Sequence, residues 1–245
     1  MEKFLNEWYG LLTFLLFDIV ALTLVIAITY RWFFKRVFDL LVSSVCIALT
    51  SPLFLAVYIR FLRFKNKAEA QLSWFVETPS IGKKGKWVAL KTFRVKDDDG
   101  DELGYYGAWL LRTRLYKLPA LLDVFMGRQS FIGVKAFSPV DAQFVDDENS
   151  ARFLMRSGLI NPLVLTGDDK LTYEEMLSAD VRYAYGASFF GDIKIFFAWV
   201  LYKAREGGKN YMGETKKIGY AESLLRDGKI TQADFDTALE SEKEE

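Results

Sequence analysis

The chain of 245 residues contains no histidine and a single cysteine, Cys46. The lack of histidine excludes imidazole general bases, Ser-His and Cys-His nucleophiles, and zinc sites with histidine ligands. One cysteine excludes an intramolecular disulfide and a cysteine metal cluster, and its apolar surroundings favour a small buried residue. Acid–base chemistry in this protein would therefore depend on carboxylates, lysine or tyrosine.

The chain also lacks net charge, because 32 Lys and Arg residues balance 32 Asp and Glu residues. A nucleic-acid partner would favour a basic excess to meet its phosphates, so we expect no nucleic-acid partner. The length predicts one compact domain with additional segments, at roughly 100 to 200 residues per domain.

What the sequence does have is long hydrophobic runs, the first at residues 11–30. A helix of this length can cross about 30 Å of hydrocarbon, so we predict a transmembrane helix. A cleaved signal peptide is disfavoured because the run is too long and no small-residue cleavage site follows it. Arg31, Lys35 and Arg36 follow the run and only Lys3 precedes it, which places the following chain in the cytoplasm and the N-terminus outside.

Asp18 lies near the middle of this predicted helix. An ionisable group at this depth is costly unless it is paired or neutralised. Two interpretations are open, a protonated and tolerated Asp18 or a contact between Asp18 and a polar group on a partner helix.

A second apolar run, residues 37–62, is interrupted by Ser51 and Pro52. Proline removes a backbone donor and clashes with the preceding turn, so we expect a break or kink there. Two half-helices with basic residues at both outer ends predict a re-entrant helix that dips into the membrane and returns to the cytoplasmic side. An ordinary kinked second transmembrane helix is the alternative.

The rest of the chain predicts a soluble domain of mixed structure. Residues 87–94 are typical of a strand after a glycine-rich turn, and the acidic residues 97–102 of a solvated loop. Residues 105–125 place leucines and aromatics along one helical face, and residues 180–204 form another amphipathic stretch that either lies in the membrane interface or closes the core.

The final stretch contains two short helical patterns separated by a turn, with Thr231 and Asp234 spaced as at a helix start. This hairpin resembles the short C-terminal oligomerisation modules of many bacterial proteins, and a partly helical solvated tail is the alternative. The predicted fold class is α/β and mostly helical. The predicted segments are a transmembrane helix at 1–30, a re-entrant helix at 31–66, a cytoplasmic domain at 67–210, and a hairpin and tail at 211–245.

Several sequence blocks then follow one another in a fixed order. They are residues 35–39 with Ser51-Pro52, 85–94, 107–119, 124–133, 156–167 and 171–195. In this order they resemble the monotopic phosphoglycosyl transferase family of bacterial sugar transferases. Its members transfer a phospho-sugar from a nucleoside diphosphate sugar to polyprenyl phosphate. The resemblance implies a bacterial inner-membrane protein with a small cytoplasmic domain.

The chain departs from this family where the chemistry would lie. The family carries an adjacent Asp-Glu pair, with the Asp as covalent nucleophile and acidic oxygens holding Mg²⁺, and here those positions are Tyr116 and Lys117. An ammonium group repels Mg²⁺, so we expect no metal and no cofactor unless the protein is active. The family's Gly-Pro-Arg-Pro turn is residues 133–136, where Lys135 keeps one charge, and the arginine of a later turn falls on Asp168.

Three functional hypotheses follow from these departures. The first is a non-catalytic paralogue (pseudoenzyme) that binds an active sugar transferase or another polysaccharide or glycoconjugate enzyme, or that self-associates. The second is an active transferase in which Tyr116 is the nucleophile, Lys117 lowers its pKa and Asp123 supplies a carboxylate. The third is a module that binds polyprenyl phosphate or a nucleotide sugar through Arg94 and Arg112, which otherwise form ordinary salt bridges.

Overall fold

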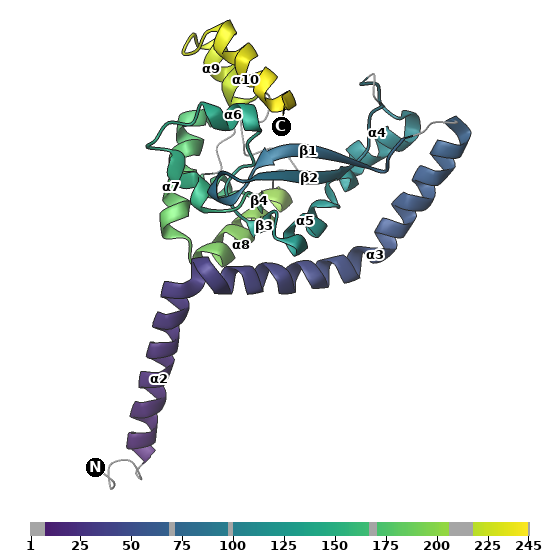
Figure 1. Ribbon diagram of the computed structural model, residues 1–245. Coiled ribbons are helices and arrows are strands. Elements are labelled where there is room, and N and C mark those ends of the chain that lie inside the picture. The colour runs from purple at the N-terminus through teal and green to yellow at the C-terminus, as the bar shows by residue number, and fades with distance from the viewer. Residues whose placement is uncertain (1–7, 69–71, 98–99, 167–170, 206–217, 245) are drawn as a thin grey trace.

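The computed structural model describes residues 8–68, 72–97, 100–166, 171–205 and 218–244. Its first helix, α2 (Trp8–Thr29), points away from the rest of the molecule (Figure 1). The large apolar side chains along α2 are exposed, for example Leu11 and Phe17 at 65% and 70%. Because α2 is long and apolar enough to cross a membrane, its exposed surface suits lipid.

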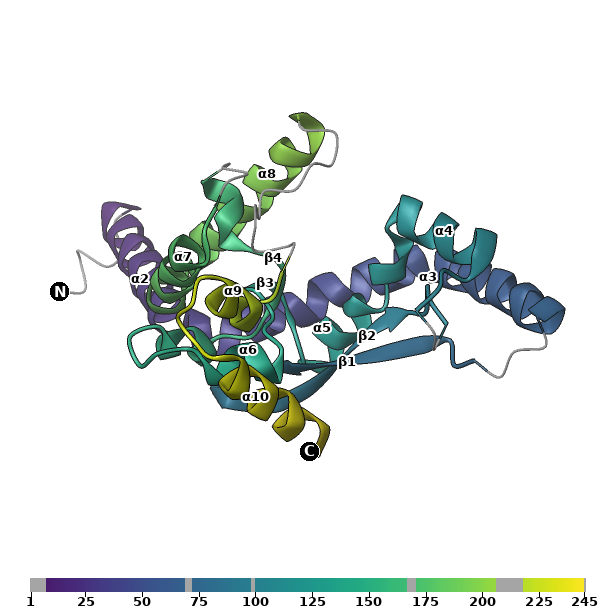
Figure 2. The same ribbon diagram turned by 90° about the horizontal axis from the view of Figure 1, so that it is seen from above.

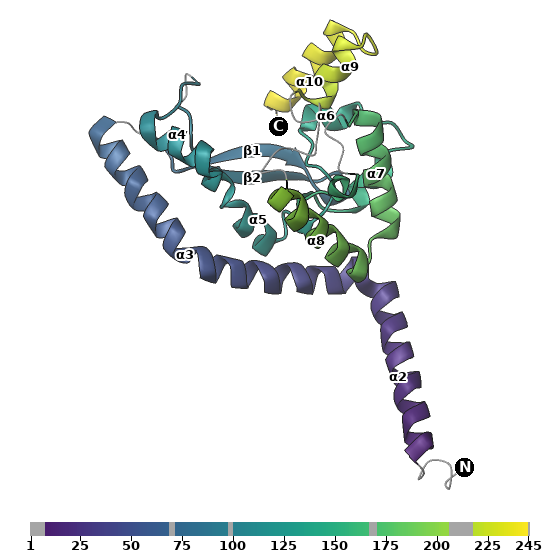
Figure 3. The same ribbon diagram turned by 180° about the vertical axis from the view of Figure 1, so that it is seen from behind.

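A π-helical turn (η1, Tyr30–Phe34) joins α2 to α3 (Lys35–Ala68), which runs beneath the domain and bends (Figures 1 and 3). Pro52 lies inside α3 and has no N–H to donate to the carbonyl of Ala48, one turn earlier. The hydroxyl of Ser51 donates to that carbonyl at 2.9 Å. The predicted kink near Pro52 is present (Figures 1 and 3). The predicted break is wrong, because α3 continues as one helix through Ser51 and Pro52.

The first half of α3 has its polar side facing the protein. Lys35, Asp39 and Ser43, spaced one turn apart, are buried against the domain. On the other side of the same helix, Leu41 and Leu49 are 60% and 75% exposed. This is the reverse of a helix on the surface of a soluble protein, which turns its apolar face inward.

An antiparallel hairpin follows, formed by β1 (Phe75–Ile81) and β2 (Trp87–Phe93). The turn between the strands contains η2 (Lys83–Gly85), in which Lys84 and Gly85 both have positive φ angles of 61° and 70°. The predicted strand and the preceding glycine-containing turn are confirmed.

The predicted helical face at residues 105–125 is divided into three elements. They are α4 (Gly104–Thr113), η3 (Leu115–Lys117) and α5 (Ala120–Met126). Arg114 ends α4 with a left-handed φ of 58°, and Pro119 precedes α5. Leu110 and Tyr106 of α4 pack with Val57 and Phe61 of α3, so the second half of α3 forms part of a core.

The remainder of the domain surrounds a short parallel pair, β3 (Ser130–Ile132) and β4 (Gly158–Ile160). The two chains approach so closely after β3 that a Cβ on Gly133 would lie 2.3 Å from the carbonyl oxygen of Arg156. Short helical segments surround this pair: α6 (Pro139–Gln143), η4 (Ser150–Leu154) and η5 (Pro162–Leu165).

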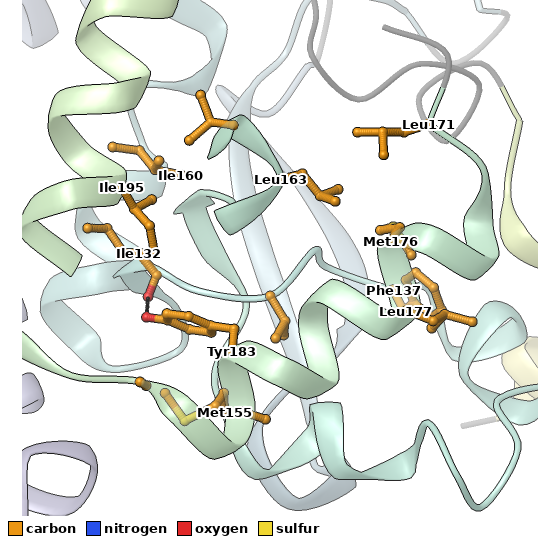
Figure 4. Packing of buried hydrophobic residues seen from close by; sticks show 14 of the residues in the cluster. Ile132, Phe137, Met155, Ile160, Leu163, Leu171, Met176, Leu177, Tyr183 and Ile195 are labelled. Carbon is orange, nitrogen blue, oxygen red and sulfur yellow. Dashed lines mark hydrogen bonds between the residues drawn. The ribbon is translucent and has the colours of Figure 1, made fainter. Parts of the chain in front are cut away.

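The predicted amphipathic stretch at 180–204 belongs to two helices, α7 (Tyr173–Gly186) and α8 (Phe189–Arg205). The expectation that this stretch closes the core is confirmed for one side of α8, because Ile195 joins the largest core cluster, while Phe197 on another side is 60% exposed and the membrane-interface alternative stays a prediction. In Figure 4 the core side chains of β3, β4 and α7 converge, and the hydroxyl of Tyr183 reaches the backbone at Ile132.

The predicted C-terminal hairpin is present as α9 (Tyr220–Arg226) and α10 (Gln232–Glu244). As predicted, Thr231 and Asp234 cap α10, with the Thr231 hydroxyl donating to Asp234 at 2.7 Å. The hairpin lies against α6, on the side of the domain remote from α2 (Figures 1 and 2). The described residues are mostly helical and form two small sheets, which confirms the predicted fold class.

Candidate functional site

Tyr116 and Lys117 lie in η3, a single tight turn between α4 and α5. Arg114 adopts a left-handed backbone, which costs a residue other than glycine about 1 kcal/mol or more. The turn is closed by two backbone bonds, from Lys117 N–H to Arg114 and from Leu118 N–H to Leu115. The backbone therefore presents these two positions in one defined geometry.

The side chains in η3 bring an ammonium group close to a phenol. Tyr116 is half-buried against the cluster that contains Phe93 and Leu110. The Lys117 side chain reaches solvent, and its Nζ lies 5.7 Å from the centroid of the Tyr116 ring. Desolvation by the surrounding protein lowers the pKa of Lys117, and the nearby Arg114 guanidinium lowers it further. With Arg114 and Lys117, this part of the chain carries two basic side chains and no acidic one.

The donor set in η3 does not fit a Mg²⁺ ion. Mg²⁺ prefers anionic oxygen ligands, whereas Lys117 supplies an ammonium group and Tyr116 a phenol. Among the described residues, no three Asp, Glu or Cys side chains are grouped so that they could hold a metal ion. We therefore derive no metal-dependent step from this site.

Asp123, which the sequence suggested as a substitute catalytic carboxylate, is fully buried in α5. Its Oδ2 accepts the backbone N–H of Lys91 at 2.7 Å, and its Oδ1 accepts a bond from Arg128 at 3.2 Å. Asp123 is thus engaged in joining α5 to β2. The idea that it shares a helix with Tyr116 is wrong, because Tyr116 lies in η3 and Pro119 separates the two elements.

Two of the three candidate anion-binding residues lie near η3 or β2. Arg94 follows β2 and donates from Nε to the carbonyl of Ser73 at 3.2 Å, so it holds the start of the hairpin. Arg112 is exposed in the last turn of α4, and no hydrogen bond or ion pair is found for it within the described part of the chain. Arg112 therefore has a cationic group free to meet an anion.

Lys135 lies in another part of the domain, beside the largest core cluster. Its Nζ donates to the hydroxyl of Tyr173 at 3.0 Å and lies 4.6 Å from the centroid of that ring. Burial lowers the pKa of Lys135 to about 8, against the opposing charge of Asp141. Because Tyr116 packs in the cluster of Phe93 and Lys135 contacts Tyr173 of the other cluster, the structure does not bring these candidates into one pocket.

Two cavities are formed by other residues. One of about 360 Å³ lies between the strand hairpin and α6, and one of about 690 Å³ lies between α7 and α9. Neither is lined by Tyr116, Lys117 or Arg112. Asp18 is exposed on α2, and Asp168 lies outside the described residues.

Sequence reasoning missed a buried polar network at the junction of η1, α3, α7 and α8. Asp192 accepts bonds from Lys35 at 2.5 Å, from Tyr30 at 2.6 Å and from Tyr183 at 2.7 Å. One turn beyond Lys35, Asp39 accepts the hydroxyl of Ser130 at 2.7 Å. The sequence does contain a signal, because Lys35, Asp39 and Ser43 are polar residues spaced four positions apart at the start of an apolar run. The sequence analysis used Lys35 only as a basic residue that flanks the predicted helices.

The model of the bacterial sugar transferase family matches residues 30–204, which is most of the described domain and excludes α9 and α10. The protein belongs to the bacterial sugar transferase family. The recognition made from the ordered sequence blocks is thus confirmed.

Among its relatives is the exopolysaccharide production protein ExoY of Rhizobium meliloti, 27% identical over 192 residues. The alignment covers 66% of this chain and 82% of ExoY. The uncharacterized sugar transferase EpsL of Bacillus subtilis is 25% identical over 171 residues, with the same coverage of both chains.

Proposed function

We propose that this protein is a non-catalytic sugar transferase family member that acts as a partner or regulator of an enzyme of exopolysaccharide production. One observation carries the proposal. The family's acidic dyad is replaced by Tyr116 and Lys117 next to Arg114, and the carboxylate suggested as a substitute, Asp123, is buried and engaged. A chain that matches the family over residues 30–204 while lacking the nucleophile and the metal ligands is most simply explained as a pseudoenzyme.

The pathway is proposed from the relatives. ExoY of Rhizobium meliloti and ExoY of Sinorhizobium fredii both carry the name exopolysaccharide production protein. The similarity to each spans the domain and not only one motif, because the alignments cover 82% of either relative.

The proposed location is the bacterial inner membrane, with the domain in the cytoplasm. Two helices, α2 and α3, are long and apolar enough to cross a membrane. The buried polar face and exposed apolar face of α3 support the re-entrant arrangement, because the first half of α3 is held against the domain while its other side suits lipid. The bend around Pro52 supports the return to the same side.

The first experiment is a transferase assay on the purified protein in lipid, with nucleotide sugars, polyprenyl phosphate and Mg²⁺. We expect no release of nucleoside monophosphate. A Tyr116→Asp, Lys117→Glu double variant is compared, because it restores the acidic residues to the same turn. Activity of the natural chain would overturn the proposal, and a phospho-sugar trapped on Tyr116 would then support the active alternative with the tyrosine as nucleophile.

The proposed partner contact is tested through Asp18. An exposed carboxyl in the middle of α2 is stabilised in a membrane by a polar group on another helix. We expect a membrane enzyme to co-purify with the natural chain and to be lost with Asp18→Asn, while Leu22→Ala on the same helix retains it. If the natural chain purifies alone or only with copies of itself, the proposal of a partner enzyme is rejected.

A second candidate function is the binding of polyprenyl phosphate without turnover. The observation that favours it is the guanidinium of Arg112, which is exposed and has no hydrogen bond or ion pair with any residue that the structure describes. We expect saturable binding of the lipid phosphate that is lost in Arg112→Ala and kept in Arg63→Ala, another exposed arginine. Equal binding by both variants would show that general charge attraction, and not a specific contact with Arg112, accounts for the binding of the lipid phosphate.

A further inference from the structure

Helix α8 keeps a broad apolar face outside the core of the domain. Its core side, which includes Ile195, packs against η5, β3 and β4. The other side carries large apolar side chains that are 37–74% exposed. They are Phe189, Phe190, Phe196, Phe197, Val200 and Leu201. A contiguous apolar face of this kind marks a surface that binds a membrane or another protein.

Basic residues border this exposed face on both of its sides. Lys203 follows Phe196 by seven residues, which places the two on the same side of the helix. At the other edge, Leu201 follows Lys194 by seven residues and precedes Arg205 by four. An apolar face with basic edges is typical of a helix in the membrane interface, where long basic side chains reach the anionic headgroups.

The exposed face of α8 also continues the lipid-facing surface of η1 and α3. The ring of Phe189 contacts the rings of Tyr30 in η1 and Phe38 in α3, with centroids 6.1 Å apart in each case. Beside this contact, Phe190 of α8 and Phe33 of η1 are 74% and 63% exposed. Figure 2 shows that α8 runs across the direction of α3 and extends beyond the rest of the domain.

We propose that the exposed face of α8 lies in the headgroup region of a bilayer with anionic lipids and fixes the orientation of the domain on the membrane. The first half of α3 alone would leave the domain free to rotate about the axis of that helix. Because α8 lies off this axis, its contact with lipid stops the rotation, while α2 and α3 remain the anchors. The proposal rests on the membrane location proposed above and not on whether the protein is catalytic.

The test is the depth of a fluorescent label on the full chain in nanodiscs of phosphatidylcholine and phosphatidylglycerol. Cys46→Ala removes the natural thiol, and Phe197→Cys then carries the label on the exposed face of α8. Leu41→Cys on α3 is the lipid control, and Ala233→Cys on the exposed side of α10 is the water control. We expect brominated acyl chains to reduce the emission at positions 197 and 41 at least about twofold and to leave position 233 unchanged.

The controls separate this proposal from the proposed membrane location. If the label at position 41 is not quenched, the location of α3 is rejected and the contact of α8 with it. If position 41 is quenched and position 197 behaves like position 233, only the contact of α8 is rejected. A label at position 197 that is shielded from water but not quenched by lipid would assign the face to another protein. Leu201→Cys repeats the measurement with a smaller change of side chain if Phe197→Cys disturbs folding.

The basic edges of α8 allow a second measurement. A Lys194→Gln, Arg205→Gln double variant, labelled at position 197, should lose part of its quenching in the anionic nanodiscs and none in phosphatidylcholine alone. Lys229→Gln on the hairpin is the matched control and should keep the natural quenching in both. Equal quenching of the double variant and the control in anionic nanodiscs would reject the contribution of anionic headgroups.

Discussion

The Lys35–Asp192 pair joins the start of α3 to α8 across more than 150 residues of sequence. Both side chains are almost fully buried, at 7% and 2% exposure, and Tyr30 and Tyr183 complete the bonding of the carboxylate. Buried charges are tolerated when they are paired and hydrogen-bonded, but removing one partner leaves the other uncompensated. The pair therefore fixes the junction between the membrane helices and the domain.

We predict that Asp192→Asn lowers the free energy of unfolding by about 3–5 kcal/mol, because the ammonium of Lys35 stays buried without its counter-charge. Thermal or denaturant unfolding in detergent measures the change. Arg226→Ala, which removes an exposed ion pair with Asp227, is the control and should change stability by less than about 1 kcal/mol. An equal effect of the two substitutions would contradict the buried network.

The lowered pKa of Lys135 predicts a pH dependence of stability. Between about pH 8, the folded value, and the unfolded value of 10.5, the unfolded chain binds the proton more tightly than the folded protein does. Stability contributed by this group therefore rises with pH across that window. Denaturation of the natural chain and of Lys135→Met measures it, and their difference should shift in favour of the natural chain as pH rises from 8 to 10.5.

At the scale of single residues, the sequence identified several candidate site residues but not the contacts that their side chains make. Tyr116 and Lys117 were identified because the resemblance to the family aligns them with its acidic pair. The pairing of Lys35 with Asp192 was not identified, because it joins distant segments and leaves no local pattern. The catalytic role considered for Asp123 did not take account of its contact with β2, because the sequence does not show that its carboxylate accepts the backbone N–H of Lys91.

At the scale of elements, the shape of α3 depends on one residue, Pro52. Pro52 removes one backbone hydrogen bond, and the Ser51 hydroxyl takes the carbonyl that is left. The bend lets the first half of the helix follow α5 and the second half pack against α4 (Figure 3). A straight helix would separate these two contacts.

We predict that Pro52→Ala straightens α3, because Ala48 regains its backbone donor. Spin labels at exposed positions 41 and 62, in a chain with Cys46→Ala, report the distance between the two halves. The distance should increase in Pro52→Ala and stay the same in Ser51→Ala, which loses only the side-chain bond. An unchanged distance in Pro52→Ala would show that packing against the domain sets the bend.

Elements were predicted best where turn residues are distinctive. The turn at Gly82–Gly85 and the capped α10 were identified because glycine and capping residues have clear local preferences. The end of α4 was missed because Arg114 has no preference for the left-handed conformation it adopts. The boundary between α7 and α8 had a signal that was overlooked, since Ser188 accepts the N–H of Gly191.

Across the whole molecule, α2 and the apolar side of α3 form an exterior that suits lipid, while the hairpin lies on the opposite side (Figures 1 and 3). We predict that a chain lacking residues 1–29 still sediments with membranes, because α3 keeps its apolar face. Replacing Leu41 and Leu49 by Glu in that shorter chain should release it to the soluble fraction. Release of the shorter chain by itself would assign anchoring to α2 alone.

The inward polar face of α3 also limits how the chain can be divided for structural work. Asp39 binds Ser130, Arg36 binds the carbonyls of Val124 and Phe125, and Phe61 fills a core with Leu110. A soluble fragment that begins after residue 68 would leave these partners unbonded and their pocket open to water. We therefore expect that the globular part of this protein does not fold independently, and that its preparation requires α3, which completes it.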